Sequence, residues 1–275
     1  MPASYFLRLL LSAACMRRKM MISKVTDTNK IEKLFADWQE SIIWSCIQKV
    51  MGNIYADSLD APKSAMAILG DFCFLAGEPN PELIQFKPDD CTQEFIIMVP
   101  QSEEWAEVIV DVYGSRSKKV TRYATKKETD VFDKNKLQTI VDDMNPLYDM
   151  KMMDEEIFKY CKANGWSKDL ISQYADYATY EKLGIGVMIL KDGEPVAGAS
   201  AYSRYEQGIE IEIDTKEEYR RKGLAYACGA KLILECLKKG LYPSWDAQNK
   251  ESLALAEKLG YHYAYDYTAF EIFAY

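Results

Sequence analysis

Three consecutive basic residues followed by a glycine form the segment of this chain best suited to bind a ligand. Arg220, Arg221 and Lys222 precede Gly223, and a helix-forming stretch follows. Backbone N–H groups at a helix start have no partner within the helix, and the helix dipole places positive charge there. A glycine has no side chain to keep a phosphate away. The loop 220–225, which also contains Leu224, therefore predicts an anion site.

Two regular elements must position this loop. Residues 209–214 alternate apolar and acidic side chains, which predicts a strand with one dry face and one wet face. Residues 224–239 are apolar over most of a helical circumference and are followed by Gly240, which predicts a buried helix. The alternative interpretation of the loop is an ordinary basic turn at the surface. The glycine patterns of a Walker loop and of a dinucleotide fingerprint are absent.

The loop resembles the pyrophosphate loop of the GCN5-related N-acetyltransferases, the GNAT superfamily. That loop has the pattern (Gln/Arg)-x-x-Gly-x-(Gly/Ala), which Arg220, Gly223 and Ala225 match. A second block is similar to the family's Asn-x-x-Ala-x-x-Leu-Tyr-x-Lys-x-Gly-(Phe/Tyr) element. Its residues in register are Asn249, Ser252, Leu255, Lys258, Gly260 and Tyr261. Ala256 departs from the pattern, because the family often has a tyrosine there. The two ends of this block are also ordinary helix caps.

The resemblance covers about residues 145–275 and implies a fold. It predicts an α/β (α+β) GNAT fold, in which helices flank a twisted, mixed and mostly antiparallel sheet. The expected elements follow the family's order. They are helices over 154–162 and 167–183, a hairpin over 186–202, the strand, loop and helix described above, a strand over 242–246, a helix and closing strands.

The first half of the chain shows a similar order of elements. We expect a helix over 29–51, a hairpin over 65–75, a strand over 95–99, a helix over 102–113 and a strand over 119–123. The helix over 102–113 begins with Glu103 and Glu104, whose carboxylates would repel a pyrophosphate. We interpret this half as a smaller, degenerate GNAT-like domain, or as an unrelated α/β domain, without a coenzyme site.

Chain length indicates more than one domain, because 275 residues exceed the usual size of a single domain. We expect a flexible N-terminal extension in 1–24, a first α/β domain in 25–140 and a catalytic domain in 145–275. The charged connection between them is expected to be part-helical around 135–142. The apolar stretch near the N-terminus is too short and interrupted to span a bilayer, and its charges are misplaced for a secretory signal.

Charge and cysteine content argue against several classes of protein. Lys and Arg number 34 and Asp and Glu 42, and the net charge of −8 disfavours a nucleic-acid partner. Seven cysteines without a C-x-x-C pair, together with one histidine, lead us to expect no metal site. Such an unpatterned set favours a reducing compartment, the cytoplasm. We expect no membrane partner, and a homodimer stays open.

The resemblance implies an N-acetyltransferase that uses acetyl-CoA as a co-substrate. The acetyl group would pass directly to an amine of a small molecule or a peptide, without a covalent enzyme intermediate. By position in the family, Ile213 and Thr215 would offer backbone groups to the pantetheine arm, and the loop 220–225 would hold the pyrophosphate. Asn249 and Ser252 would line the far side.

The attacking amine must lose a proton, because an ammonium ion is not a nucleophile. Glu210, Glu212 and Asp214 share the acidic face of the expected strand and are the candidates for the base or for a water relay to it. We favour Glu212. The alternative for each of them is a solvated strand face. Ala256 leaves the general acid unassigned.

Two other functions compete with this one. A protein with a GNAT fold could sense acyl-CoA or act as a scaffold without doing chemistry, which the missing tyrosine supports. A tandem-GNAT aminoacyl transferase would use charged tRNA, which the negative charge and the intact coenzyme loop disfavour. Turnover of an amine tests the first alternative, and RNA binding at low salt tests the second. No motif identifies the acceptor amine.

Overall fold

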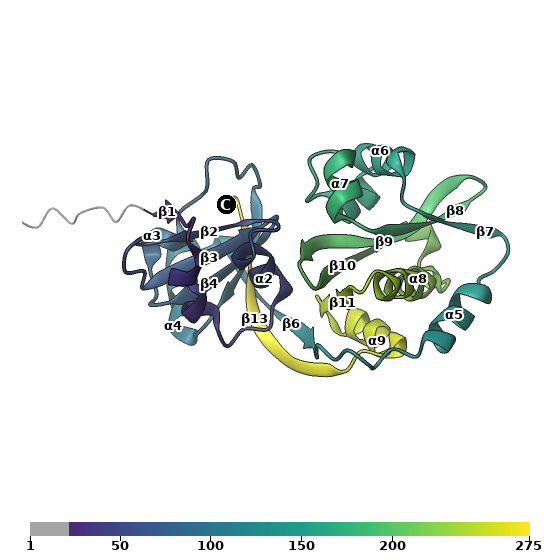
Figure 1. Cartoon of the computed structure of the whole chain (residues 1–275). Coiled ribbons are helices and arrows are strands. Elements are labelled where there is room, and N and C mark those ends of the chain that lie inside the picture. Colours follow the sequence, from purple (N-terminus) through teal and green to yellow (C-terminus); the bar gives the residue numbers. More distant parts are fainter. Residues whose placement is uncertain (1–21) are drawn as a thin grey trace, which may run out of the picture.

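Two twisted sheets form the framework of the structure, a computed structural model that describes residues 22–275 (Figure 1). One sheet has eight strands in the order β1-β2-β3-β4-β5-β13-β6-β12, and the other has five in the order β11-β10-β9-β8-β7. Helices flank both sheets, which confirms the predicted fold class. Most of the expected N-terminal extension, residues 1–21, lies outside the described residues.

The eight-stranded sheet comes mainly from the first half of the chain. Its strands are β1 (Ser23–Lys24), β2 (Asn53–Ala56), β3 (Ser64–Leu69), β4 (Phe72–Gly77), β5 (Phe95–Pro100), β6 (Ser117–Thr125), β12 (Asp246–Ala247) and β13 (Tyr263–Phe273). Its helices are α2 (Ser41–Ile47), α3 (Pro81–Ile84) and α4 (Glu103–Tyr113). The hairpin β3–β4 and the helix α4 are as predicted, and Ser102 caps α4 by accepting the Trp105 N–H.

The five-stranded sheet comes from the second half. Its strands are β7 (Tyr148–Met152), β8 (Gly186–Lys191), β9 (Glu194–Tyr205), β10 (Gly208–Thr215) and β11 (Tyr242–Ser244). Its helices are α5 (Lys134–Asp142), α6 (Glu155–Ala163), α7 (Tyr177–Leu183), α8 (Leu224–Lys238) and α9 (Lys250–Leu259). Strands β7 to β10 are antiparallel and β11 runs parallel to β10. Strand β7 was not among the predicted elements.

Two predicted helices are wrong in extent. The segment 29–51 forms 3₁₀ turns at Thr28–Lys30 and Glu32–Phe35 before α2 begins. Its apolar spacing is real, but Glu40 has an extended backbone that interrupts the helix. The segment 167–183 divides into a 3₁₀ helix, Gly165–Ile171, and α7. Asp176 starts α7 afresh because its side chain accepts the Thr179 N–H, which favours an N-cap over continuation.

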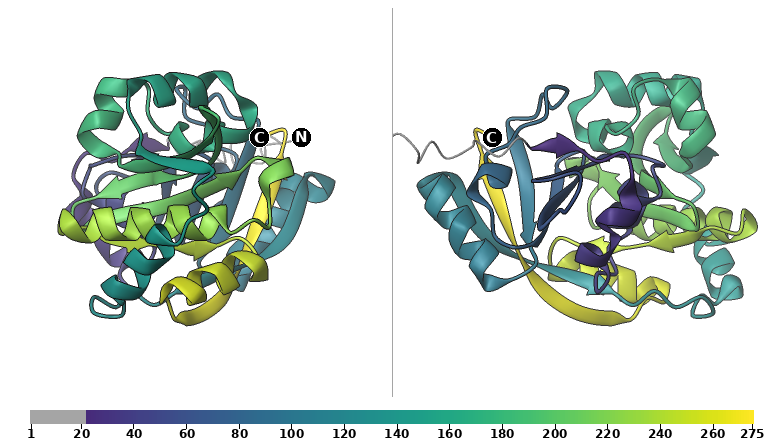
Figure 2. Two further views of the ribbon diagram at one scale, coloured as in Figure 1. Left: turned by 90° about the vertical axis from the view of Figure 1, so that its right-hand side faces the viewer. Right: turned by 60° about the vertical axis from the view of Figure 1, so that its left-hand side comes forward.

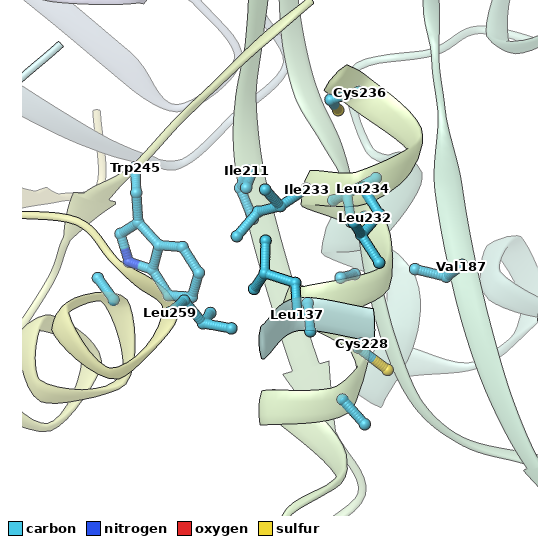
Figure 3. Close-up of a cluster of buried hydrophobic side chains, with 14 of the residues drawn as sticks. Leu137, Val187, Ile211, Cys228, Leu232, Ile233, Leu234, Cys236, Trp245 and Leu259 are labelled. Carbon is cyan, nitrogen blue, oxygen red and sulfur yellow. The ribbon is translucent and has the colours of Figure 1, made fainter. Parts of the chain in front are cut away.

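The core of the second half lies under α8 (Figure 3). The alternation in β10 turns Ile209 and Ile211 inward, and both are buried against this helix. Leu137 of α5 and Leu259 of α9 pack beside α8 in the same cluster. Helices α6 and α7 cover the other face of the sheet, as the views in Figures 1 and 2 agree. The core therefore fixes the end of β10 relative to the start of α8.

The same strand arrangement occurs in both halves. Strands β4 and β5 are parallel in the first half, as β10 and β11 are in the second. The connection between the parallel strands contains α3 in the first half and α8 in the second. The helix that begins with Glu103 and Glu104 is α4, which follows the parallel pair. The position comparable to the α8 loop is therefore the start of α3, and the comparison with α4 was wrong.

The chain passes from one sheet to the other at Trp245. Residues just before it pair with β10 in the five-stranded sheet, and residues just after it pair with β6 in the eight-stranded sheet. After α9, strand β13 inserts between β5 and β6 (Figure 1). The sheets thus do not follow the expected boundary near 140–145, because β12 and β13 of the second half belong to the eight-stranded sheet.

The insertion of β13 predicts an unusual effect of a substitution near the end of the chain. Phe270 is 2% exposed within the core of the first half, so Phe270→Ala should lower the free energy of unfolding by about 3–5 kcal/mol. Phe273 lies on the same strand and is 48% exposed, so Phe273→Ala should cost less than about 1 kcal/mol. Urea denaturation measures both changes. Equal losses in the two variants would contradict the placement of β13.

Candidate active site

The basic loop between β10 and α8 is open to solvent. Arg220, Arg221, Lys222 and Gly223 are all exposed, and no side chain caps the start of α8. The N–H groups of the first helical turn therefore have neither an intrahelical partner nor a capping side chain. Arg220 Nε donates to the Thr215 carbonyl at 3.3 Å, which ties the loop to the end of β10. The arrangement is suited to an anion.

Gly223 is required by its backbone conformation and not by crowding. Its φ is 81°, in the left-handed region, and a Cβ built there would have nothing within 4 Å. A side chain at this position would therefore be strained and would also project into the open space before the helix. That space is where an anion would approach the N–H groups.

Strands β10 and β11 separate in the middle of the sheet. They pair only over Gly208–Glu210 and Tyr242–Ser244, while β10 continues to Thr215 paired with β9 alone. One edge of residues 211–215 is thus without a strand partner, and this edge holds Ile213 and Thr215. The Thr215 hydroxyl is also buried without a hydrogen-bond partner. Unpaired backbone groups at such an edge are available to a bound molecule.

Asn249 and Ser252 have structural partners at the start of α9. The Asn249 side chain accepts the Ser252 N–H at 2.8 Å and so caps the helix. Ser252 Oγ accepts the Trp245 indole N–H at 3.1 Å. Ala256 is fully buried in the core of the second half, so the position where the family often has a tyrosine does not face solvent. These hydrogen bonds of Asn249 and Ser252 lie within their own part of the chain and do not involve the loop 220–225.

The acidic face of β10 is covered, so the expectation of a solvated strand face is wrong for Glu210. Glu210 is 7% exposed, and Ser41 at the start of α2 donates a hydrogen bond to its carboxylate. Glu212 and Asp214 are partly buried, and the 3₁₀ helix Gly165–Ile171 packs against this strand. The covering elements come from both halves, which local alternation cannot reveal.

A small cavity of about 50 Å³ lies where the two halves meet. Residues of β10 line it at the point where pairing with β11 ends. The full lining consists of Glu40, Ser41, Ile42, Phe72, Phe74, Arg122, Tyr202, Glu210, Ile211, Glu212, Asp246 and Tyr267. The structure thus brings Glu210 and Glu212 to one cavity, while the residues of the loop 220–225 lie outside it.

Burial changes the acidity of the carboxyl groups on β10. Desolvation, together with the charges of Asp214, Asp169 and Asp71, raises the pKa of Glu212 to about 8. Desolvation and Asp169 raise the pKa of Asp214 to about 6. A carboxylate with a pKa near the working pH is a better general base than an ordinary one. Glu212 has this property and also lines the cavity.

A buried ion pair closes one side of the cavity. Arg122 Nε and Nη2 both lie 2.7 Å from Asp246 Oδ1, and the guanidinium carbon lies 4.8 Å from the centre of the Phe72 ring. The Tyr267 hydroxyl donates to Asp246 Oδ2 at 3.0 Å. The pair joins β6, β12 and β13. Removing one partner of such a pair leaves an uncompensated buried charge, which is strongly destabilising.

Sequence reasoning missed the residues that the first half and the closing strand contribute. The Tyr265 hydroxyl donates to Glu40 Oε1 at 3.0 Å, and burial raises the pKa of Glu40 to about 7. The Tyr202 hydroxyl donates to Asp71 in the β3–β4 turn. The one available signal is the alternation of Tyr263, Tyr265 and Tyr267 along the last strand. Alternation predicts a face, but it does not say which partner that face meets.

The described part of the chain, residues 22–275, contains no group of three or more His, Cys, Asp and Glu side chains placed to hold a metal ion. None of its helices has both the length and the apolarity needed to cross a membrane. His262 pairs through Nδ1 with Glu128 at 2.7 Å at the surface.

Comparison with known proteins gives consistent matches. A family model described as GNAT acetyltransferase matches residues 32–270. The curated protein "Uncharacterized N-acetyltransferase YdfB" of Bacillus subtilis (strain 168) is 24% identical over 249 residues, covering 81% of this chain and 86% of that protein.

Solved structures agree with these matches. A GCN5-related N-acetyltransferase-like protein from Streptococcus suis 89/1591 is 46% identical, with a TM-score of 0.85, covering 90% of this chain and 98% of that chain. A GCN5-related N-acetyltransferase from Kribbella flavida is 17% identical, with a TM-score of 0.50 and coverage of 77% and 86%, and its likeness is one of fold alone. With a family model that matches most of its length, the chain belongs to the GNAT acetyltransferase family.

Proposed function

We propose that the protein is an N-acetyltransferase that moves an acetyl group from acetyl-CoA to an amine of a small molecule or a peptide. One observation carries the proposal. The unpaired edge of β10 runs from the basic loop before α8 to the point where β10 and β11 separate, and there it meets the cavity. A coenzyme along this edge would reach the cavity with its thioester end.

The loop 220–225, the unpaired edge of β10 and Glu212 each have a role in this reaction. The loop 220–225 holds the pyrophosphate through backbone N–H groups and cations, and the edge at Ile213 and Thr215 binds the pantetheine arm. Glu212 takes a proton from the acceptor ammonium, and the freed nitrogen attacks the thioester carbonyl. The new carbon–nitrogen bond forms as the carbon–sulfur bond breaks. The nitrogen then loses its second proton, which the departing thiolate takes up through water.

A non-catalytic acyl-CoA sensor is the second candidate. It is favoured by Ala256, because an alanine has no phenol that could act as a general acid at that position. A free thiol has a pKa of about 8.5, so the thiolate can leave near neutral pH without a phenol to protonate it. We therefore favour the enzyme, and acetylation of any amine by the purified protein would decide between the two.

The coenzyme site is tested by a pair of matched glycine substitutions. Gly223 and Gly240 lie at opposite ends of α8, both with positive φ and both with open space around a built Cβ. Valine should strain the two positions similarly, but only Gly223→Val places a branched side chain before the N–H groups. We expect Gly223→Val to weaken acetyl-CoA binding at least about tenfold in calorimetry, since each charge-assisted contact contributes about 1.5–3 kcal/mol. Equal affinity in the two variants would refute this site.

The number of coenzymes per chain is a separate prediction. We propose that the first half is GNAT-like without a coenzyme site, because its comparable helix, α3, has four residues and a side-chain cap. Asn80 Oδ1 accepts the N–H groups of Glu82 and Leu83 at 2.9 and 3.2 Å, so these donors are already occupied. Native mass spectrometry should show one acetyl-CoA per polypeptide. Two would show that the first half is a working copy.

The role of Glu212 predicts a pH dependence. The base acts when deprotonated, and its pKa is raised to about 8, so kcat/KM should rise with pH up to about 8. Glu212→Gln should lower kcat about 10²–10⁴-fold at neutral pH, the usual contribution of general-base catalysis, while acetyl-CoA affinity changes little. The loss should shrink as the pH nears the pKa of the acceptor amine. Unchanged kcat in the variant would remove Glu212 from this role.

The same substitution predicts a change in stability that does not depend on activity. The folded protein raises the pKa of Glu212, so ionisation of this carboxyl disfavours folding. The penalty begins above about pH 4.3, where the unfolded carboxyl ionises, and is complete above the folded pKa of about 8. Glu212→Gln should therefore match the parent near pH 4 and gain relative stability as the pH rises to 9. A constant difference in urea denaturation would contradict the raised pKa.

A further inference from the structure

We propose that the cavity between the two sheets binds an acceptor that carries two ammonium groups and no carboxylate, as a linear diamine does. The reacting nitrogen would lie at Glu212 and the second ammonium at Glu210 and Glu40. This inference rests on the proposed function and adds the chemical class of the acceptor to it.

An unpartnered carboxylate oxygen gives the first argument. Glu210 is only 7% exposed, and one of its carboxylate oxygens accepts a hydrogen bond from the Ser41 hydroxyl. The other oxygen, Oε1, is buried without any hydrogen-bond partner. Buried polar atoms nearly always have a partner, so an unpaired one that lines a cavity indicates that a donor binds there. The residue also lies beside the point where the coenzyme edge ends.

The charges of the lining determine the sign of the ligand. Carboxyl groups of Glu40, Glu210, Glu212 and Asp246 face the cavity, against the single guanidinium of Arg122. Arg122 is already engaged by Asp246 through two nitrogens. Lys127 lies near enough to lower the pKa of Glu40 and of Glu210, but it is not among the residues that line the cavity. The lining therefore offers sites for cations, and it includes no free cation for a carboxylate.

Spacing and size favour a thin chain. Side chains two residues apart on a strand face the same side at a separation of about 7 Å. The backbone positions of Glu210 and Glu212 are therefore about as far apart as the nitrogens of a diamine with about four methylenes. A cavity of about 50 Å³ is narrow, which favours a linear chain over a ring. Phe74 and Tyr267 add aromatic surface for the methylenes.

The aromatic walls are also consistent with a cation. An ammonium near the face of an aromatic ring is attracted by the negative charge density of that face. The structure already shows this kind of contact at Phe72, whose ring receives the Arg122 guanidinium. Tyr265 orients Glu40 by its hydrogen bond to Oε1, which leaves the other oxygen for the ligand. Each charge-assisted hydrogen bond contributes about 1.5–3 kcal/mol, which is about a 10–150-fold change in affinity.

Three acceptors that share a four-carbon chain test the proposal. Acetyl-CoA-dependent acetylation is measured at pH 8 with 1,4-diaminobutane, butylamine and 4-aminobutanoate, which differ only in the far end of the chain. We expect kcat/KM for the diamine to exceed that for butylamine at least about tenfold, and 4-aminobutanoate to be the poorest. Direct binding of 1,4-diaminobutane and butylamine is measured by calorimetry without acetyl-CoA.

Two variants assign the effect to the cavity. Glu210→Gln removes one charge and should reduce the ratio of kcat/KM between the diamine and butylamine toward one. Glu40→Gln is the second variant, in case the first does not fold, and should act in the same direction. Glu194→Gln makes the same substitution at an exposed residue of β9 and should keep the parent ratio.

The outcomes separate this proposal from the proposed function. Acetylation of all three acceptors at similar rates, or best of 4-aminobutanoate, would overturn the diamine site while the enzyme stands. Diamine binding that depends on Glu210, without acetylation of any amine, would support the site while the enzyme proposal fails. The absence of both diamine binding and a diamine preference would overturn the site.

Discussion

The insertion of β13 between β5 and β6 determines how the two halves of the molecule meet. The strand leaves the second half after α9 and pairs along most of its length with β6. Its Tyr267 holds Asp246, which also pairs with Arg122 of β6, so one buried ion pair connects three strands. A rigid connection of this kind places the first half against the acidic face of β10. Without it, that face would be solvated.

Covering that face is what changes the chemistry of its carboxyl groups. Glu210 accepts a hydrogen bond from Ser41 of α2. Ser45 of the same helix donates to the Arg204 carbonyl at 2.6 Å, which attaches α2 to β9. Gly70 in the β3–β4 turn lies so close to Tyr202 that a Cβ there would be 2.4 Å from the hydroxyl. Burial raises the pKa of Glu212, and the charges of Asp214, Asp169 and Asp71 add to this effect. The first half therefore acts as a wall of the site.

The two functional parts of the molecule differ in how they are built. The basic loop is local, because its strand, glycine and helix are consecutive in the chain and depend on one core cluster under α8. The cavity is assembled from α2, β4, β6, β9, β10, β12 and β13. If the cavity binds the acceptor, as we propose, substitutions in the first half can alter this site without altering the loop.

The sequence by itself determined the elements whose signals are local. Gly223 and the alternation of β10 predicted the strand, loop and helix, and Asn249 and Gly260 predicted the ends of α9, because caps and side-chain periodicity act over a few residues. The tertiary structure alone decided which sheet received β13, that Glu40 and Asp246 face one cavity, and that Glu210 is buried. These depend on strand pairing and packing between elements more than a hundred residues apart, and alternation along one strand does not specify the partner of either face.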